Sequence, residues 1–246
     1  MKLIIGMHRA GTSLTARLLK QAGADLGDPA GFIKPDRWNP DGYFEQEEIL
    51  RLNRLLLHGP WGRFALLFPP TRGTVIARGR RLAGPLAAAG LRHAHQVVKD
   101  PRFCVTAPAW QEHGTRFEKV IICLRDPAEV AASLRRRNSL PRFLGLRLWR
   151  QHYADNLRLA QACPHWWVSY AHLVDPESCV GEVAGLARFL GLPFDEQRDG
   201  PWVRSVVRLR SGEQPAAATA YGPELARLWQ EVCARHRAQS AGRGGD

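Results

Sequence analysis

The stretch KLIIGMHRAGTSLTARLL, residues 2–19, predicts a strand, a glycine loop and a helix in immediate succession. The apolar run at residues 3–5 ends at Gly6 and is typical of a buried parallel strand. After the loop, apolar side chains recur at helical spacing, and Gly23 supplies a stop. These apolar positions are Leu14, Leu18, Leu19 and Ala22. The chain therefore opens with a unit of the kind that binds an anion between a strand and a helix.

The loop keeps the glycine spacing of a nucleotide-binding loop but lacks its lysine. Gly6 and Gly11 are five residues apart, and Thr12 stands where a nucleotide triphosphatase has lysine. Backbone N–H groups and the positive end of the helix can still hold a phosphate or sulfate at residues 11–13. Without the lysine, however, the loop is poorly equipped to transfer a dianionic phosphoryl group. A sulfuryl group carries less negative charge, so it can be transferred without a metal, with Arg9 as the cation on the transferring group and its leaving oxygen.

Three further apolar runs predict strands that alternate with helices. HQVVKDPRF (95–103) and EKVIICLRDPAEVAASL (118–134) each contain a short strand, and HWWVSY (165–170) is a fourth. Helices are expected at 45–58, from Pro127 onward, and at 145–162, 180–192 and 223–238. This alternation predicts an α/β fold with a central parallel sheet and helices on both faces.

Three other segments are expected to be irregular. Residues 24–44 are dense in Gly, Pro, Asn and Asp, which predicts a long loop of the kind that forms lids or binding segments. Residues 211–222 are linker-like, and residues 240–246 are expected to be disordered.

Composition sets the remaining limits. The 246 residues, 45% hydrophobic, favour one domain with one core. The net charge of +12 comes mostly from arginine, which binds phosphate and sulfate oxygens bidentately. Two explanations account equally well for this excess: an anionic ligand, or a coding bias that spreads arginine over solvated faces.

Five cysteines without a CxxC pair or a histidine at metal-ligand spacing predict reduced, mostly buried thiols. No apolar run approaches the roughly 20 residues that cross a bilayer, and a strand starts almost at residue 1, so a cytoplasmic location is expected.

The loop GMHRAGTSL (6–14) resembles the 5′-phosphosulfate-binding loop of the sulfotransferases that use 3′-phosphoadenosine 5′-phosphosulfate (PAPS). The resemblance assigns five loop residues to PAPS: Arg9, Ala10, Gly11, Thr12 and Ser13. It also implies a second signature, an arginine at the end of a central strand and a serine two turns into the next helix, which together bind the 3′-phosphate. Arg125 and Ser133 match it, eight residues apart. The resemblance therefore implies a P-loop-like three-layer α/β/α fold across residues 1–246, and adenosine 3′,5′-bisphosphate as the second product.

Sulfuryl transfer needs a base for the acceptor proton and cations on the oxygens of the transferring group. Glu45, which NPDGYFE (39–45) delivers to the start of a helix, is the best candidate for the base. Lys99 is expected to reach the bridging or sulfuryl oxygens, and Arg102 to orient Glu45 or to bind an acidic acceptor. The motif VVKDPRF resembles the Lys-Asp-Pro of tyrosylprotein-type sulfotransferases, which use a glutamate in the region that corresponds to Glu45. Bacterial carbohydrate and small-molecule sulfotransferases are also similar in motif, whereas the cytosolic small-molecule enzymes use a histidine after the second strand.

Other side chains are secondary candidates. Four aromatic residues either wall an acceptor pocket or pack in the core: Trp38, Tyr43, Phe44 and Trp61. Three histidines remain alternatives for the base: His93, His95 and His152. The segment VRSVVRLRSG (203–212) resembles the basic segment with which sulfotransferases close over the nucleotide, which makes three arginines candidates for that role: Arg204, Arg208 and Arg210.

Two other functions stay open. A P-loop kinase for a small metabolite would use ATP and Mg²⁺, with Asp100 or Asp126 as the metal carboxylate, but each aspartate has a capping role available. Asp126 precedes Pro127 and stands three residues before Glu129, and Asp100 precedes a helix expected near Pro101. A basic polyanion-binding module is the non-enzymatic alternative.

The partners expected of a sulfotransferase are PAPS and a small-molecule, carbohydrate or peptide acceptor. The acceptor group is a hydroxyl or an amine. Nucleic acid, stable membrane insertion and a required metal are not expected, and the protein is expected to be a monomer or a homodimer.

Overall fold

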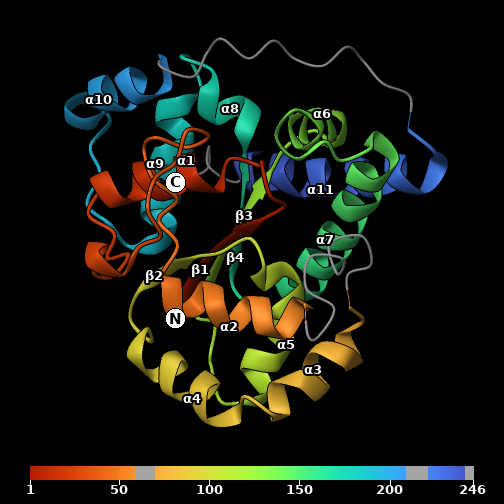
Figure 1. Ribbon diagram of the computed structural model, residues 1–246. Helices are drawn as coiled ribbons and strands as arrows, with labels where there is room; N and C mark the ends of the chain where they lie inside the picture. Colours follow the sequence, from red (N-terminus) through yellow and green to blue (C-terminus); the bar gives the residue numbers. More distant parts are fainter. Residues whose placement is uncertain (59–69, 209–220, 242–246) are drawn as a thin grey trace.

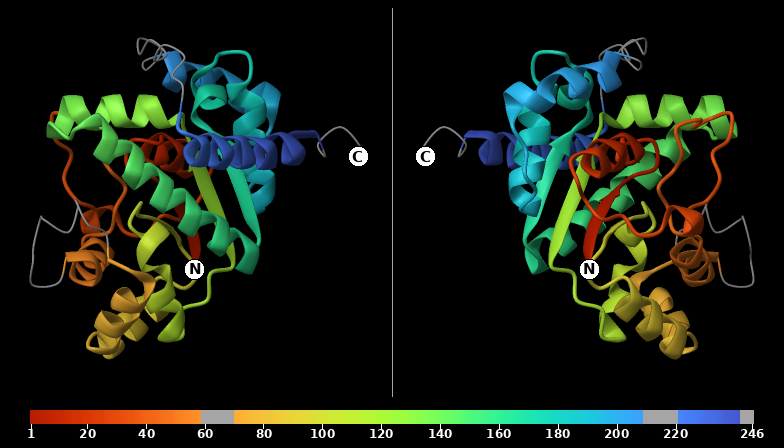
Figure 2. Two further views of the ribbon diagram at one scale, coloured as in Figure 1. Left: turned by 90° about the vertical axis from the view of Figure 1, so that its right-hand side faces the viewer. Right: turned by 90° about the vertical axis from the view of Figure 1, so that its left-hand side faces the viewer.

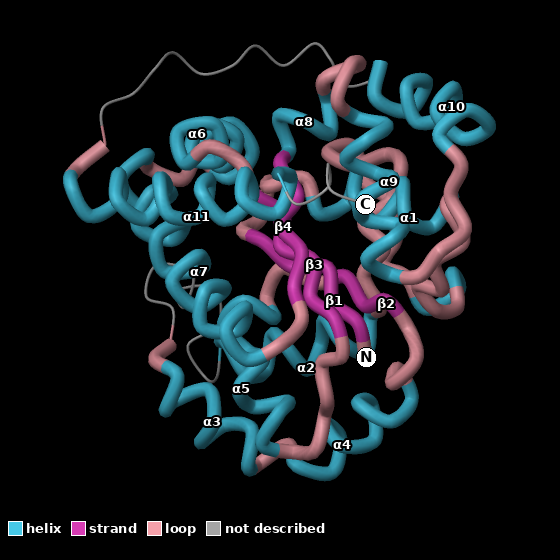
Figure 3. Tube along the Cα trace, turned by 180° about the vertical axis from the view of Figure 1, so that it is seen from behind, coloured by secondary structure: helices cyan, strands magenta, loops and turns pink. Residues whose placement is uncertain are grey.

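A four-stranded parallel sheet forms the centre of the protein. The computed structural model describes residues 1–58, 70–208 and 221–241. The strands are β1 (Lys2–Gly6), β2 (Val97–Lys99), β3 (Lys119–Leu124) and β4 (His165–Ser169), in the order β2-β1-β3-β4. All neighbouring pairs are parallel, with Ile4 opposite both Lys99 and Ile121. The four strands expected from the sequence are therefore present and form one sheet, seen edge-on in Figure 1 and from behind in Figure 3.

Helices cover both faces of the sheet. The helices are α1 (Thr12–Gln21), α2 (Glu47–His58), α3 (Arg72–Arg80), α4 (Ala83–Arg92), α5 (Phe103–Glu112), α6 (Pro127–Asn138), α7 (Arg142–Ala162), α8 (Tyr170–Val174), α9 (Cys179–Leu190), α10 (Glu196–Arg208) and α11 (Pro223–Ala241), with a 3-10 turn η1 (Pro29–Gly31). On one face α1 and α9 pack together, and on the other α5, α7 and α11 pack against the sheet and one another (Figure 2). The helices α2, α3 and α4 gather around α5. The predicted three-layer α/β/α fold is confirmed.

Aromatic side chains brace the carboxyl end of β3, where the site lies. The Trp149 and Tyr153 rings of α7 stack with centroids 4.1 Å apart. The Trp149 indole N–H donates to the Arg125 carbonyl at 3.0 Å, and the Tyr153 hydroxyl donates to the Cys123 carbonyl at 2.5 Å. These bonds anchor two backbone carbonyls at the carboxyl end of β3 to α7, and so they hold the backbone on both sides of Leu124 and Arg125 in place.

Several element boundaries differ from those expected. The helix expected at 45–58 begins at Glu47, and the helix expected at 145–162 begins at Arg142. The helices α3, α4, α8 and α10 were not anticipated: α8 begins at Tyr170, which was expected in the fourth strand, and α10 includes part of the basic segment 203–212. Ser240 and Ala241 belong to α11 and are not disordered. Most of the predicted linker, 211–222, lies outside the described residues, as do residues 242–246.

The two predicted helix caps have different outcomes. Asp126 caps α6 by accepting from the N–H groups of Ala128 at 2.8 Å and Glu129 at 3.2 Å. Asp100 does not cap α5, because the N-cap is Arg102. Its carboxylate instead accepts from the Arg102 N–H at 2.9 Å in the turn before the helix.

Two further expectations concern thiols and membranes. All five cysteines are free, and three of them are buried: Cys104, Cys123 and Cys179. Within the described ranges, no helix has both the length and the apolar character needed to cross a membrane.

Candidate functional site

The candidate site lies where the parallel strands end, the edge at which open α/β sheets bind their ligands. The glycine loop follows β1, Lys99 ends β2, Arg125 follows β3 and Tyr170 follows β4. Four segments that are distant in sequence therefore contribute to one edge of the sheet.

The loop conformation requires its glycines. Gly6 has φ +146°, and a Cβ there would lie 2.7 Å from the Cys123 carbonyl oxygen. Gly11 has φ +94°, and a Cβ there would lie 2.5 Å from Cδ2 of Tyr170. Arg9 also has positive φ, 72°, which is rare for a residue with a side chain and is found at functional loops. The chain accepts this strain and close packing to keep the loop tight.

The start of α1 is open to an anion. Gly11 is its N-cap and has no side chain to accept from the first-turn N–H groups, and no side chain in the described part of the chain caps them. The first turn also contains no acidic residue. A helix start with free donors and the positive end of the helix dipole favours phosphate or sulfate.

The cation that the loop lacks comes from the neighbouring strand. The Lys99 ammonium at the end of β2 donates to Ser13 Oγ at 3.2 Å and to Glu45 Oε1 at 2.6 Å. Both Lys99 and Glu45 are buried. Lys99 thus lies beside the first turn of α1, close to where a nucleotide triphosphatase has its loop lysine.

Glu45 belongs to a buried network of two cations and two anions. Its second oxygen accepts from Arg102 Nη1 at 3.0 Å, and Arg102 also donates to Asp100 at 2.9 Å. The other Asp100 oxygen accepts from the Asn53 amide at 3.0 Å. The formal charges cancel, which is the condition under which such charges are tolerated away from water.

The network sets the protonation of its members. Burial alone would raise the pKa of Glu45, but the charges and hydrogen bonds of Lys99 and Arg102 outweigh it and lower that pKa. Burial would lower the pKa of Arg102, but Asp100 and Glu45 outweigh it and raise that pKa. Glu45 is therefore ionised at neutral pH, as a proton acceptor must be.

The second signature lies against the first. Arg9 Nε donates to Ser133 Oγ at 2.9 Å, and Arg125 Nη1 donates to the Arg9 carbonyl at 3.1 Å. Arg125 also pairs with Glu129 at 2.9 Å and lies over the Tyr170 ring, 4.0 Å from its centroid. Arg9, Arg125 and Ser133 therefore form one cationic cluster.

Three predicted residues have placements that the sequence did not indicate. Arg9 was expected at the transferring group, but its Nε contacts Ser133 and so lies with the residues assigned to the 3′-phosphate. Thr12 is buried at the start of α1, whereas Ser13 is half-buried and contacts Lys99.

The long loop at residues 24–44 is tied to the end of α6. Arg137 donates to the Tyr43 hydroxyl at 2.6 Å, and that hydroxyl donates to Asp36 at 2.6 Å. The Arg137 guanidinium also lies 5.9 Å from the centroid of Trp38, which is 40% exposed. Phe44 packs edge-on against Phe32, and Trp61 lies outside the described residues. Of these aromatic residues, Trp38 is exposed, Tyr43 is half-buried with its hydroxyl bound to Arg137 and Asp36, and Phe44 packs against Phe32.

The histidine alternatives for the base do not join the Glu45 network. His93 is buried and bonds to Gln96 and Glu48. His95 is exposed in the turn before β2. His152 is buried, its Nδ1 lies 2.8 Å from the Leu148 carbonyl oxygen, and burial lowers its pKa to about 4.

A fourth histidine, His8, lies at the site without having been indicated by the sequence. It lies inside the glycine loop, half-buried, with its ring centroid 6.4 Å from that of His152. Burial lowers its pKa well below the usual range, and the charges of Arg102 and Lys99 add to the effect. A neutral imidazole therefore lies near the Glu45 network, and its position within GMHRAGTS was the available signal.

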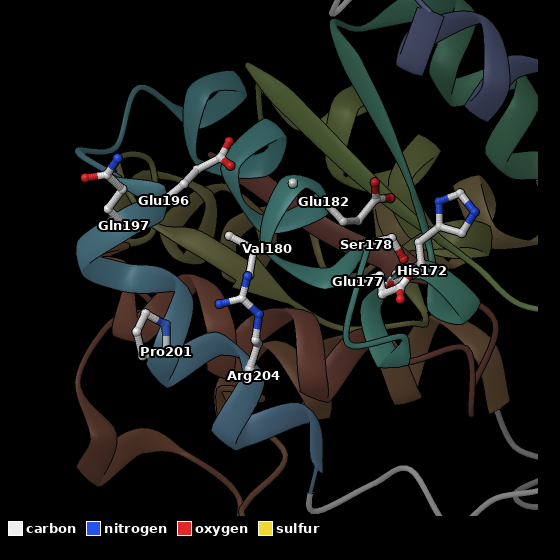
Figure 4. A pocket seen from close by; sticks show the side chains of 10 residues that line it. His172, Glu177, Ser178, Val180, Glu182, Glu196, Gln197, Pro201 and Arg204 are labelled. Carbon is white, nitrogen blue, oxygen red and sulfur yellow. Dashed lines mark hydrogen bonds between the residues drawn. The ribbon is translucent and has the colours of Figure 1, made fainter.

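One arginine of the basic segment 203–212 lies away from the candidate site. Arg204 lies on α10 and lines a pocket of about 630 Å³ whose walls include none of the loop, Lys99 or Arg125 (Figure 4). The side chain of Arg208 and all of Arg210 lie outside what the structure describes.

The carboxylates of the kinase alternative are committed to other contacts. Both oxygens of Asp126 accept from the Tyr221 hydroxyl at 2.7 Å, in addition to capping α6. Asp100 is fully buried between Arg102 and Asn53. Neither aspartate presents an oxygen to the loop, which disfavours a Mg²⁺ site of the kinase type.

Comparison with solved structures shows which fold this arrangement belongs to. A sulfotransferase domain from the curacin biosynthetic pathway matches 95% of this chain and 97% of its own, with a TM-score of 0.53 and 12% identity. The sulfotransferase domain of the Synechococcus PCC 7002 olefin synthase matches 95% of this chain and 94% of its own, with a TM-score of 0.52 and 18% identity. The sequence matches no family model and no curated protein. The chain thus has the fold of sulfotransferase domains.

Proposed function

We propose that this protein is a sulfotransferase that moves the sulfuryl group of PAPS to the hydroxyl or amine of an acceptor. The observation that carries the proposal is the pair of neighbouring cationic sites at one sheet edge. One comprises the α1 N-terminus with Lys99, and the other comprises Arg9, Arg125 and Ser133. A nucleotide with anions at both its 5′ and 3′ positions is the ligand that such a pair fits.

The residues of the site divide between holding the donor and assisting transfer. The first-turn N–H groups of α1 would hold the 5′-phosphosulfate, and Arg125, Ser133 and Arg9 would hold the 3′-phosphate. In the transfer, a bond forms between the acceptor atom and sulfur while the bond from sulfur to the bridging oxygen breaks. The leaving bisphosphate keeps that electron pair, and the acceptor proton passes to Glu45.

Lys99 would link the two ends of this reaction. Its ammonium holds Glu45 at 2.6 Å, which contributes to the low proton affinity of the carboxylate. As charge develops on the leaving oxygen beside α1, Lys99 is drawn toward that oxygen, and its hold on Glu45 weakens. Glu45 then becomes more basic as the acceptor loses its proton, which is the timing that general-base catalysis requires.

The acceptor is proposed only as a class, a small molecule, carbohydrate or peptide. The segment around Trp38 and Tyr43 lies next to Arg137, whose charge contributes to lowering the pKa of His8. An acceptor bound there would lie beside the same network as Glu45, with an aromatic surface to pack against.

Nucleotide binding tests this proposal directly. Adenosine 3′,5′-bisphosphate, at a concentration about 100 times its Kd, should stabilise the protein by about 2.7 kcal/mol. Arg125→Lys should weaken binding at least tenfold, because lysine lacks the planar fork of arginine. Arg51→Ala, which removes an exposed arginine from α2, is the control and should bind as the wild type does.

The alternatives predict different outcomes of the same experiment. If ATP with Mg²⁺ stabilises the protein and the bisphosphate does not, then the protein is a kinase and the proposal is wrong. Binding of polyanions that falls steeply with salt and ignores Arg125→Lys would favour the basic module.

A further inference from the structure

Three potential metal ligands converge beyond the end of β4. They are His172 on α8, Glu182 on α9 and His236 on α11, and one ligand atom of each lies within 4.8 Å of the others. The His236 Nε2 atom is 2.9 Å from Glu182 Oε1, and the two imidazole rings have centroids 4.9 Å apart. Glu182 and His236 are buried, and His172 is exposed. The residues come from three separate helices, so packing alone brings them together.

This set of atoms suits a divalent transition metal. Two imidazoles and a glutamate are the protein ligands of a well-known kind of tetrahedral zinc site. Tetrahedral bonds of about 2.0–2.1 Å place ligand atoms roughly 3.3 Å apart. The pair Glu182 and His236 is already near that separation, and the exposed His172 can close the remaining distance by a side-chain rotation.

The surroundings support the same role. The backbone N–H of Ser169 donates to Glu182 Oε1 at 2.9 Å, which fixes the carboxylate as outer-shell donors do at metal sites. His172 and Glu182 also line the pocket of about 630 Å³ between α8, α9 and α10. In Figure 4 the Glu182 carboxylate reaches toward the His172 imidazole at one end of this pocket, far from Glu196 and Gln197. The pocket offers space for a water as the fourth ligand.

We propose that His172, Glu182 and His236 form a binding site for a divalent transition metal of the zinc type. The metal joins α8, α9 and α11 and so fastens the last described helix to the sheet. It also bears on the nucleotide site, because His172 is two residues after Tyr170, whose ring lies under Arg125. The site uses none of the residues proposed for sulfuryl transfer. It therefore goes beyond that function, and its test does not depend on whether the proposed function is correct.

The other explanation is a buried hydrogen bond between Glu182 and His236 beside an unrelated surface histidine. The two explanations differ in what they predict for His172. If the hydrogen bond is the whole feature, then removing His172 changes no metal affinity. If the three residues are ligands, then His172→Ala removes one of them without breaking the buried bond or emptying the core, because His172 is exposed.

Zinc titration of the full chain decides between them. Chelator-treated protein is titrated with Zn²⁺ against a chromophoric competitor, in parallel with thermal unfolding. The wild type should bind one Zn²⁺ and unfold at a higher temperature with the metal than without it. His172→Ala should bind at least tenfold more weakly but unfold at the wild-type temperature when metal-free. His95→Ala, which removes another exposed histidine, should bind as the wild type does.

Cobalt supplies an independent readout of the ligand geometry. Co²⁺ in a four-coordinate site gives intense visible absorption bands, which should appear at one equivalent in the wild type and vanish in His172→Ala. The proposal is overturned if the wild type does not bind one equivalent of Zn²⁺, or if His172→Ala matches the wild type in affinity and in the Co²⁺ spectrum.

Discussion

The ammonium of Lys99 lies 2.6 Å from Oε1 of Glu45 and 3.2 Å from the hydroxyl of Ser13. Through these contacts Lys99 touches both the candidate base and the first turn of α1, where we propose that the donor binds. A loop lysine would reach the anion alone. Because Lys99 comes from β2, it also contacts Glu45, and in the proposed reaction this contact would couple the charge at the leaving oxygen to the proton affinity of Glu45.

Replacing Glu45 by glutamine should slow transfer by about 10²–10⁴-fold, the usual contribution of a general base. The amide keeps the size of the carboxylate but cannot take the acceptor proton. Affinity for the bisphosphate, measured by calorimetry, should stay near the wild-type value because the donor site is intact. His8→Gln is the comparison. If that variant loses activity and Glu45→Gln keeps it, then His8 is the base.

Lys99→Met should reduce both activity and stability. The variant leaves Glu45 buried with Arg102 as its remaining cation, and loss of one partner of a buried pair costs about 3–5 kcal/mol. Urea unfolding measures this loss. The double variant Lys99→Met/Glu45→Gln should recover part of the stability but none of the activity. Equal stability of the single and double variants would contradict the buried pairing.

Gly11→Ala should destabilise the protein more than Gly23→Ala does. The two glycines have nearly the same φ, +94° and +96°, but a Cβ at Gly11 would meet Tyr170 at 2.5 Å, whereas nothing lies within 4 Å at Gly23. Gly23→Ala therefore measures the left-handed backbone cost, about 1–2 kcal/mol. The excess measured for Gly11→Ala reports the contact with Tyr170, and the same variant should weaken bisphosphate binding. Equal losses would show that Tyr170 moves aside freely.

Ser133→Ala should weaken the binding of the bisphosphate more than it weakens the binding of adenosine 5′-monophosphate. Ser133 contacts Arg9 at 2.9 Å within the cluster assigned to the 3′-phosphate, and a hydrogen bond to a charged group is worth about 1.5–3 kcal/mol. Calorimetry with both nucleotides separates the effects. An equal loss for the two nucleotides would place Ser133 outside the 3′-phosphate site.

Stability should fall as the pH drops from about 6.5 to about 4, in part through His152. Burial lowers the pKa of this histidine to about 4 from the usual 6.5. Between those values the unfolded chain binds a proton that the folded chain excludes. The free energy of unfolding therefore decreases as the pH falls from about 6.5 to about 4. His152→Leu should reduce proton uptake on unfolding by about one in this window. An unchanged pH slope in this variant would refute the assignment.

Local sequence signals predicted the supports of the site with good accuracy. The strand, loop and helix at residues 2–21 follow from apolar spacing and glycine positions, and the Asp126 cap follows from a polar residue before a proline. Arg125 and Ser133 lie on a strand end and on the second turn of the helix that follows. These features depend on hydrogen bonds and periodicities within a few residues, which the sequence specifies directly.

Tertiary packing decided which side chains meet. The order β2-β1-β3-β4 places Lys99 beside the loop, and the long loop brings Glu45 to it from 54 positions away. The same packing turned Arg9 toward Ser133, placed His8 near the charged network, and brought together His172, Glu182 and His236 from three helices. Ligand-spacing rules could not reveal that last cluster, because its members share no local motif. Such contacts depend on the order of strands and the packing of helices, which are properties of the whole chain.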